Sequence, residues 1–202
     1  YEVKSFGDTL LLEAESPDGE DGFPGNLKIS VRYILTEDNA LRMDYRVSSD
    51  ADTVLNLTNH TYFNLNGHES GSIEGQVLQI FADAYTPVVD SSAIPTGEIA
   101  SVEGTPMDFR TEKQIGQDIR ADFEQLHFTG GYDHNYVLGR PGEKKIMANA
   151  YCRESGIALE AATDCCGVQF YAGNFIGEQT GKGGASYHDR SAFCLESQFY
   201  PN

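Results

Sequence analysis

Short stretches in which apolar and polar residues alternate dominate the chain, and this is the pattern of strands with one buried face. Runs bounded by Gly, Pro, Asn and Asp predict strands at residues 27–35, 40–48, 53–65, 77–84, 144–152, 157–163, 168–172 and 192–200. Glu37–Asn39 and Glu154–Gly156 lie between consecutive runs as short turns, which predicts antiparallel hairpins. The one predicted helix is short, around residues 115–125.

Many short strands without long helical crossovers indicate an all-β fold, a large antiparallel β-sandwich, and exclude a parallel α/β sheet. A chain of 202 residues suits one such domain, so we expect a single domain over residues 1–202. Two long segments rich in Gly, Pro and Ser, residues 87–110 and 173–186, are of the kind that shapes binding sites.

The amino-acid composition argues against membrane and nucleic-acid partners. Hydrophobic residues make up 40% of the chain, and no apolar run approaches the roughly 20 residues of a membrane helix. The formal net charge of −17 disfavours nucleic acid and anionic membranes, which bind basic surfaces. We therefore expect no nucleic-acid and no membrane partner, and a neutral or cationic small molecule instead.

The cysteines indicate a reducing compartment. Cys152, Cys165, Cys166 and Cys194 show neither the density of a disulfide scaffold nor paired metal-ligand spacing. We expect buried free thiols and a cytoplasmic protein. No signal peptide opens the chain, and Tyr1 without a preceding Met indicates a start within a longer sequence.

The segment NLTNHTYFNL, residues 56–65, carries the first candidate chemistry. One side of it presents Asn56, Thr58, His60, Tyr62 and Asn64, which is too polar for a packed core. A lone histidine on a strand is more often structural than catalytic. Its hydroxyl and amide neighbours, however, suit a polyhydroxylated ligand, and an aromatic ring can stack on a sugar. The pattern predicts a sugar site.

Three further residues are candidates for the same site. Period two places Glu196 in the middle of a strand, on the face opposite Phe193 and Leu195, where either a solvated or a functional carboxylate fits. Asp133 follows a glycine turn and is either a turn residue or a ligand contact. Gln169 is uninformative when taken alone.

The sequence contains none of the common motifs of metal or cofactor sites. No HxH, HExxH or CxxC arrangement involves His60, His134, Asp133 or Glu196, so we expect no catalytic metal. No GxGxxG follows a strand, and neither a P-loop nor a GxSxG motif is present. We therefore expect no cofactor and no acyl-enzyme.

Six motifs in order resemble the aldose 1-epimerase (galactose mutarotase) family and together span the chain. They are SPDGEDGFPGNL (16–27), NLTNHTYFNLNG (56–67), IPTGEI (94–99), GGYDHNYVL (130–138), GVQFYAGN (167–174) and FCLESQFYPN (193–202). The resemblance implies a large antiparallel β-sandwich, a monomer or homodimer, that binds a free hexose without metal or cofactor.

The resemblance also implies roles for particular residues. His60 matches the family's catalytic acid and Glu196 its catalytic base, while Asp133 and Gln169 match its sugar-binding aspartate and glutamine. His134 is interpreted as structural. The implied activity is interconversion of the α and β anomers of a free aldose such as galactose or glucose, by acid and base ring opening and closure.

The chain also departs from the family pattern. The family's upstream arginine and histidine, in NRI-like and LHGG-like motifs, have no match here, and its closing strand would follow Asn202. The resemblance therefore implies a sandwich truncated at both ends, which we expect to be aggregation-prone and nearly inactive when expressed alone. The alternatives are a hexose-phosphate epimerase, a glycoside hydrolase that uses Asp133 and Glu196, and a non-catalytic carbohydrate-binding module.

Overall fold

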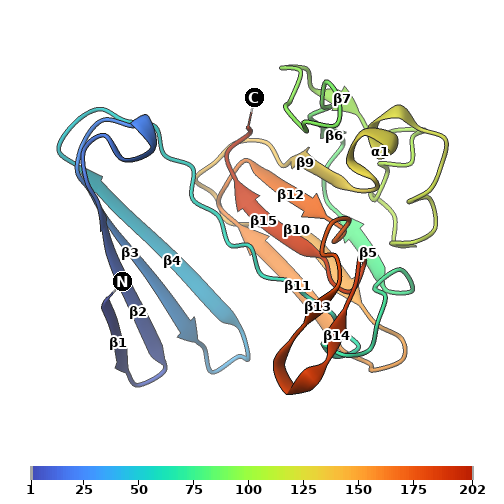
Figure 1. Ribbon diagram of the computed structural model, residues 1–202, viewed down its shortest axis with the longest axis horizontal. Coiled ribbons are helices and arrows are strands. Elements are labelled where there is room, and N and C mark those ends of the chain that lie inside the picture. The colour runs from blue at the N-terminus through green and yellow to red at the C-terminus, as the bar shows by residue number, and fades with distance from the viewer. Residues whose placement is uncertain (1, 202) are drawn as a thin grey trace. The chain divides into compact units, whose positions relative to one another are not determined.

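The structure is a computed structural model that describes residues 2–201, and it divides the chain into two compact units, Tyr1–Leu57 and Thr58–Asn202 (Figure 1). Each unit is described by itself. Every paired strand in both units runs antiparallel to its neighbour, which confirms the all-β antiparallel class. A single domain over residues 1–202 stays a prediction.

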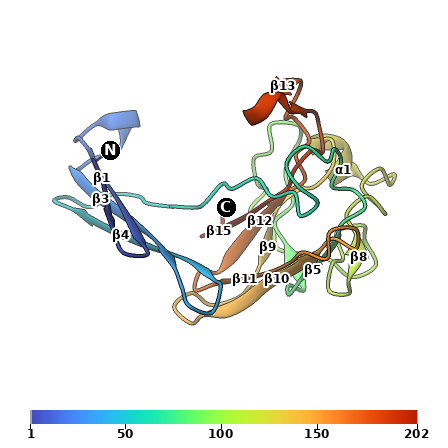
Figure 2. The same ribbon diagram turned by 90° about the horizontal axis from the view of Figure 1, so that it is seen from below.

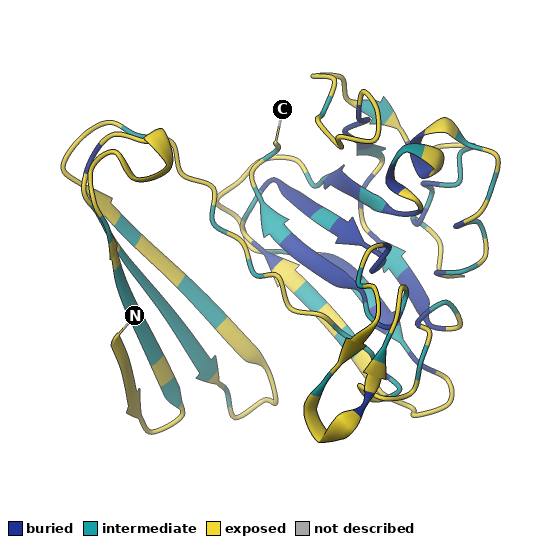
Figure 3. Ribbon diagram, viewed as in Figure 1, coloured by how far each residue is buried: buried dark blue, intermediate teal, exposed yellow. Residues whose placement is uncertain are grey.

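The first unit is a four-stranded meander with the strand order β1-β2-β3-β4. Its strands are β1 (Glu2–Phe6), β2 (Thr9–Ser16), β3 (Leu27–Leu35) and β4 (Leu41–Ser49), and a 3-10 turn (Glu20–Gly22) follows β2 (Figures 1 and 2). The hairpin between β3 and β4 confirms the turn predicted at residues 37–39. In this unit, Gly25 is the only described residue that is buried (Figure 3).

The second unit holds two larger sheets, with the strand orders β11-β10-β5-β8 and β15-β12-β9-β6-β7, and the small hairpin β13-β14. The strands are β5 (Val77–Ile80), β6 (Ala84–Tyr85), β7 (Ala100–Ser101), β8 (Lys113–Gln114), β9 (Asp133–Val137), β10 (Lys145–Tyr151), β11 (Ala158–Thr163), β12 (Gly167–Tyr171), β13 (Gln179–Thr180), β14 (Ser186–Tyr187) and β15 (Cys194–Gln198). A helix, α1 (Glu124–Thr129), and a 3-10 turn (Lys182–Gly184) complete the unit. The predicted hairpin at residues 154–156 joins β10 and β11, as expected.

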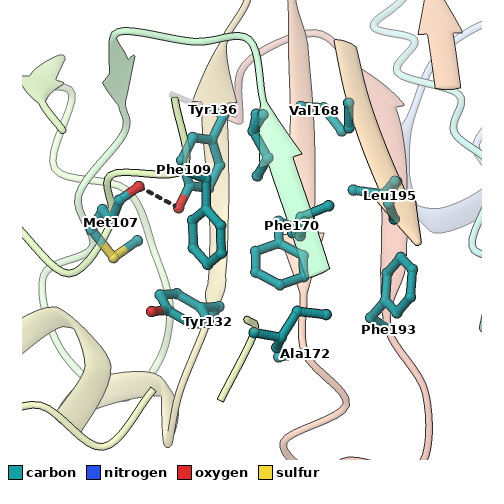
Figure 4. Packing of buried hydrophobic residues seen from close by; sticks show 14 of the residues in the cluster. Met107, Phe109, Tyr132, Tyr136, Val168, Phe170, Ala172, Phe193 and Leu195 are labelled. Carbon is teal, nitrogen blue, oxygen red and sulfur yellow. Dashed lines mark hydrogen bonds between the residues drawn. The ribbon is translucent and has the colours of Figure 1, made fainter. Parts of the chain in front are cut away.

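The two larger sheets share one core. Buried side chains of β5 and β10 form a single cluster with those of β9, β12 and β15, so the sheets pack face to face as a sandwich. Phe170 of β12 lies 5.3 Å from the ring of Tyr132 and 5.4 Å from that of Phe109, measured between ring centroids (Figure 4). The buried Tyr136 hydroxyl donates a 3.0 Å hydrogen bond to the carbonyl of Met107, which satisfies it inside the core. The long loop 87–110 thus supplies core side chains as well as surface.

Two predictions from the sequence are wrong: the strand at residues 53–65 and the position of the helix. Residues 53–65 do not form a strand, and only Phe63 makes an isolated bridge, to Phe193. Asn59 Oδ1 accepts a hydrogen bond from the Thr61 amide, and such local bonds between side chain and backbone compete with sheet pairing. The helix lies at Glu124–Thr129 instead of 115–125, and it ends at Gly130, whose φ of 65° allows the left-handed cap.

The sequence pattern predicted neither β1, β2 and β9 nor the two-residue strands β7, β8, β13 and β14. Three consecutive leucines, residues 10–12, interrupt the alternation of β2. Asp133, for which the sequence left open a turn residue or a ligand contact, is the first residue of β9. Over residues 2–201, no helix has the length and apolar character needed to cross a bilayer.

Candidate active site

The strands β9, β12 and β15 bring alternate residues of three distant segments onto one surface. Gln169 on the central strand lies opposite Asn135 of β9 and Glu196 of β15, and Tyr171 lies opposite Asp133 and Cys194. Paired residues of antiparallel strands point to the same face. The surface, here called the polar face, consists of Asp133, Asn135, Gln169, Tyr171, Cys194, Glu196 and Gln198.

A chain of amide hydrogen bonds crosses the polar face. Gln198 Nε2 donates to Asn135 Oδ1 at 3.1 Å and to Gln169 Oε1 at 3.3 Å. Gln169 Nε2 in turn donates to Asp133 Oδ1 at 2.8 Å. Gly167 leaves room for this chain, because a Cβ there would lie 2.4 Å from Asn135 Oδ1. The orientation of the Gln169 amide is therefore set by its neighbours.

His60 reaches the polar face through a backbone bridge. Phe63 and Phe193 exchange two backbone hydrogen bonds, of 2.7 and 2.9 Å, which hold the segment before Phe63 beside the start of β15. His60 Nε2 then lies 3.3 Å from Glu196 Oε1, and its Nδ1 lies 3.4 Å from Cys194 Sγ. An imidazole and a carboxylate are thus in contact at the edge of the polar face.

Aromatic rings flank this pair. The ring of His60 lies 5.1 Å from that of Tyr62 and 6.2 Å from that of Tyr171, and the two tyrosine rings are 6.2 Å apart. Burial raises the pKa of both tyrosines, so their hydroxyls stay protonated near neutral pH. They offer hydroxyl donors and apolar ring faces beside the imidazole.

Burial controls the charge of the carboxyl groups here. The side chain of Glu196 is 10% exposed and that of His60 is 50% exposed. Burial raises the pKa of Glu196 despite the attraction of His60, and the nearby Asp133 adds to the rise. Pairing with His60 by itself favours the ionised carboxylate, but desolvation outweighs this attraction. Burial likewise raises the pKa of Asp133, against the hydrogen bond from Gln169 and the attraction of His60.

His134 lies on the opposite, core-facing side of β9. It is 1% exposed, its Nδ1 accepts a hydrogen bond from the Asp133 amide at 3.2 Å, and its Nε2 lies 3.2 Å from Gln125 Oε1. Burial lowers its pKa to about 4, so the ring is neutral at physiological pH. These contacts agree with its interpretation as structural.

Other members of the predicted sugar-facing set have different roles. Asn64 Nδ2 donates to the carbonyls of Gly71 and Ser191, both at 2.9 Å, and its Oδ1 accepts from Gln76 Nε2 at 2.7 Å. Asn64 therefore ties loops together. Asn56 belongs to the first unit.

Three ligand-type side chains also converge at this place. One donor atom each of His60, Cys194 and Glu196 lie within 4.8 Å of one another. Sequence spacing did not reveal this cluster, although period two places Cys194 on the same face as Glu196. A hollow of about 690 Å³ occurs elsewhere, on the sheet of the first unit beside Glu13, Lys28 and Arg46, and no predicted site residue lines it.

The family model described as aldose 1-epimerase matches residues 1–202. The chain belongs to the aldose 1-epimerase family. It is 45% identical to galactose mutarotase of Sus scrofa over 188 residues, which are 93% of this chain and 53% of that protein. It is 40% identical to aldose 1-epimerase of Escherichia coli K12 over 194 residues, 96% of this chain and 55% of that protein. The chain thus spans about half the length of these relatives.

Solved structures of the family share the fold. A GalM/aldose epimerase homologue from C. elegans aligns with a TM-score of 0.83 at 28% identity. The alignment covers 100% of this chain and 60% of the homologue's chain. Galactose 1-epimerase from Lactobacillus acidophilus aligns with a TM-score of 0.82 at 30% identity. The alignment covers 99% of this chain and 57% of the epimerase chain. The family and fold predicted from the six motifs are confirmed, whereas the roles of His60, Glu196, Asp133 and Gln169 stay predictions.

Proposed function

We propose that this chain carries the acid and the base of an aldose 1-epimerase, which interconverts the α and β anomers of a free hexose such as galactose or glucose. One observation carries the proposal: His60 Nε2 lies 3.3 Å from Glu196 Oε1, beside the hydrogen-bonded Asp133 and Gln169. An acid and a base in reach of one substrate are what anomer exchange needs.

In the proposed reaction, Glu196 takes the proton of the C1 hydroxyl while His60 gives a proton to the ring oxygen. The C1–ring oxygen bond then breaks and C1 becomes a carbonyl. After rotation about the C1–C2 bond, the ring oxygen attacks the other face of the carbonyl, and both protons return. No atom or charge is left over. Each paired transfer contributes roughly 10²- to 10⁴-fold to the rate.

The surroundings of Glu196 suit a base. Burial raises its pKa, which makes the carboxylate a stronger base than an exposed one and brings its pKa closer to neutral pH. His60, the half-exposed partner, gives its proton to the ring oxygen and takes it back on ring closure. The buried member is therefore the base and the exposed member is the acid.

Asp133 and Gln169 position the sugar in this proposal. The Asp133 carboxylate accepts one hydrogen bond from Gln169 and keeps capacity for sugar hydroxyls. The rings of Tyr62 and Tyr171 offer apolar surface to the sugar ring. Correct placement matters because an error of about 1 Å can cost on the order of 10²-fold in rate.

The polar face favours an uncharged aldose over a hexose phosphate. None of its residues is Lys or Arg, whereas phosphate recognition relies on such cations. The cysteines at positions 152, 165, 166 and 194 are all free thiols, which supports a reducing compartment, and we propose the cytoplasm.

Polarimetry with freshly dissolved α-galactose or α-glucose tests the proposal. Because the chain alone is expected to be nearly inactive, we expect the wild-type chain to speed the optical change only slightly above the uncatalysed rate, and Glu196→Gln to abolish that increase. Glu160→Gln, a change of the same chemistry at an exposed position of β11, serves as the control and should keep the wild-type rate. Equal rates for Glu196→Gln and wild type would refute the assignment. A rate seen only with glucose 6-phosphate would favour the phosphosugar alternative.

A further inference from the structure

The cluster of His60, Cys194 and Glu196 contains a group that the proposed reaction does not use, the thiol. Cys194 and Glu196 are two residues apart on β15 and point to the same face, and the Cys194 sulfur lies 3.4 Å from His60 Nδ1. One donor atom from each of the three lies within 4.8 Å of the other two. A sulfur, a nitrogen and an oxygen donor therefore lie close enough together to face one ion.

This donor set selects a particular class of ion. Zinc binds cysteine sulfur at about 2.3 Å and histidine nitrogen or carboxylate oxygen at about 2.0 to 2.2 Å, which leaves its ligand atoms about 3 to 4 Å apart. The 3.4 Å between sulfur and imidazole already falls in that range. Thiolate and imidazole favour zinc, cobalt or cadmium over magnesium and calcium, which prefer oxygen ligands alone.

The exposure of the three side chains and the negative charge near them agree with binding. Cys194 and Glu196 are buried on a strand, whereas the His60 side chain is 50% exposed and precedes the Phe63 bridge on a segment without strand structure. The Asp133 carboxyl also faces the cluster from β9 and adds negative charge that attracts a cation.

We propose that His60, Cys194 and Glu196 form a site for a thiophilic divalent cation such as zinc, and that an ion bound there blocks the proton transfers of the same residues. The blocking rests on the proposed function, whereas the binding does not. Three protein ligands leave a fourth position for water. The thiol releases its proton to solvent as the sulfur–metal bond forms.

Cobalt(II) added to the metal-free chain tests the site directly, because a cobalt–thiolate bond gives a charge-transfer band in the near ultraviolet. We expect this band with the wild-type chain and its loss when zinc displaces the cobalt. Cys194→Ser should remove the band. Cys166→Ser, which changes another buried thiol, should keep it and is the matched control. Failure to see the band with the wild type, or its persistence in Cys194→Ser, would overturn the proposal.

A second variant covers the case in which Cys194→Ser does not fold. His60→Gln changes a half-exposed side chain and should lower the cobalt affinity by about tenfold or more; an unchanged affinity would overturn the ligand set.

Mutarotation measured with and without zinc separates the two proposals. Inhibition reversed by a chelator supports the blocking role, and bound zinc without inhibition overturns it. A chain that binds cobalt through Cys194 but never shows mutarotation would support the site and count against the proposed function.

Discussion

The two faces of β9, β12 and β15 consist of alternate residues of the same strands but have opposite energetics. On one face Tyr136, Val168, Phe170 and Leu195 are at most 6% exposed and belong to the hydrophobic core. On the other, burial raises the pKa of Glu196, so the fold holds this carboxylate where ionisation is unfavourable. The comparison indicates that one face supplies stability and the other gives up some of it, as the proposed role of Glu196 as a base would require.

The largest effect should come from the core face. Phe170→Ala removes a fully buried ring that packs on Phe109 and Tyr132, and we expect it to lower the free energy of unfolding by about 3 to 5 kcal/mol. Urea unfolding followed by circular dichroism measures this change. Phe175→Ala is the control because Phe175 is 67% exposed, and it should have a much smaller effect. Equal losses for the two variants would contradict the comparison.

On the polar face, we expect Glu196→Gln to lower the rate of mutarotation without lowering stability. The rate of mutarotation should fall roughly 10²- to 10⁴-fold, because an amide cannot take the C1 hydroxyl proton. The free energy of unfolding at neutral pH should not fall, because the amide removes a buried ionisable group at nearly constant shape. Polarimetry and urea unfolding of the same preparation measure both. A variant that loses stability and rate together would show that Glu196 is structural.

For His60→Asn we expect loss of turnover at the lower end of the same range, about 10²-fold. The half-exposed ring contributes little to packing, so the unfolding curve should stay close to that of the wild type. Initial rates over a series of sugar concentrations separate kcat from KM. A rise in KM at unchanged kcat would make His60 a binding residue instead of the acid.

Much of the fold could be predicted because strand periodicity is local. Alternation identified β3, β10, β11 and β15, and two turns gave the right hairpins. Residues 53–65 show where this reasoning fails, because asparagine side chains there bond to neighbouring backbone, which no alternation pattern reveals.

The site could be predicted only in part, for a related physical reason. Period two put Glu196 on a polar face, but its contact with His60 depends on the bridge between Phe63 and Phe193. That bridge joins segments far apart in sequence, so spacing carried no information about it. The sequence likewise gave no sign of the hydrogen bond from Gln198 to Gln169, because this bond depends on the pairing of β12 with β15.

The hydrogen bond from Gln198 should have a smaller effect. Gln198→Met removes the donor to Gln169 Oε1 and frees that amide to turn away from Asp133. One hydrogen bond is worth about 0.5 to 1.5 kcal/mol, so we expect KM for the sugar to rise about 2- to 10-fold at nearly constant kcat. Equal reductions of kcat and of kcat/KM, with KM unchanged, would place Gln198 in the chemical step instead.

The smallest expected effect is on the pH dependence of stability, because burial and the attraction of His60 act on Glu196 in opposite directions and only their difference remains. Since burial prevails, the folded state holds the Glu196 proton more tightly than the unfolded chain, whose pKa is near the ordinary 4.5. The stability that this proton provides is fully present below that pKa and is lost as pH rises through the higher pKa of the folded state. Urea unfolding of wild type and Glu196→Gln between about pH 4 and 8 should therefore show the wild type losing stability relative to the variant as pH increases. A wild type that gains on the variant with rising pH would mean that the attraction of His60 outweighs burial, and that Glu196 is stabilised as a carboxylate.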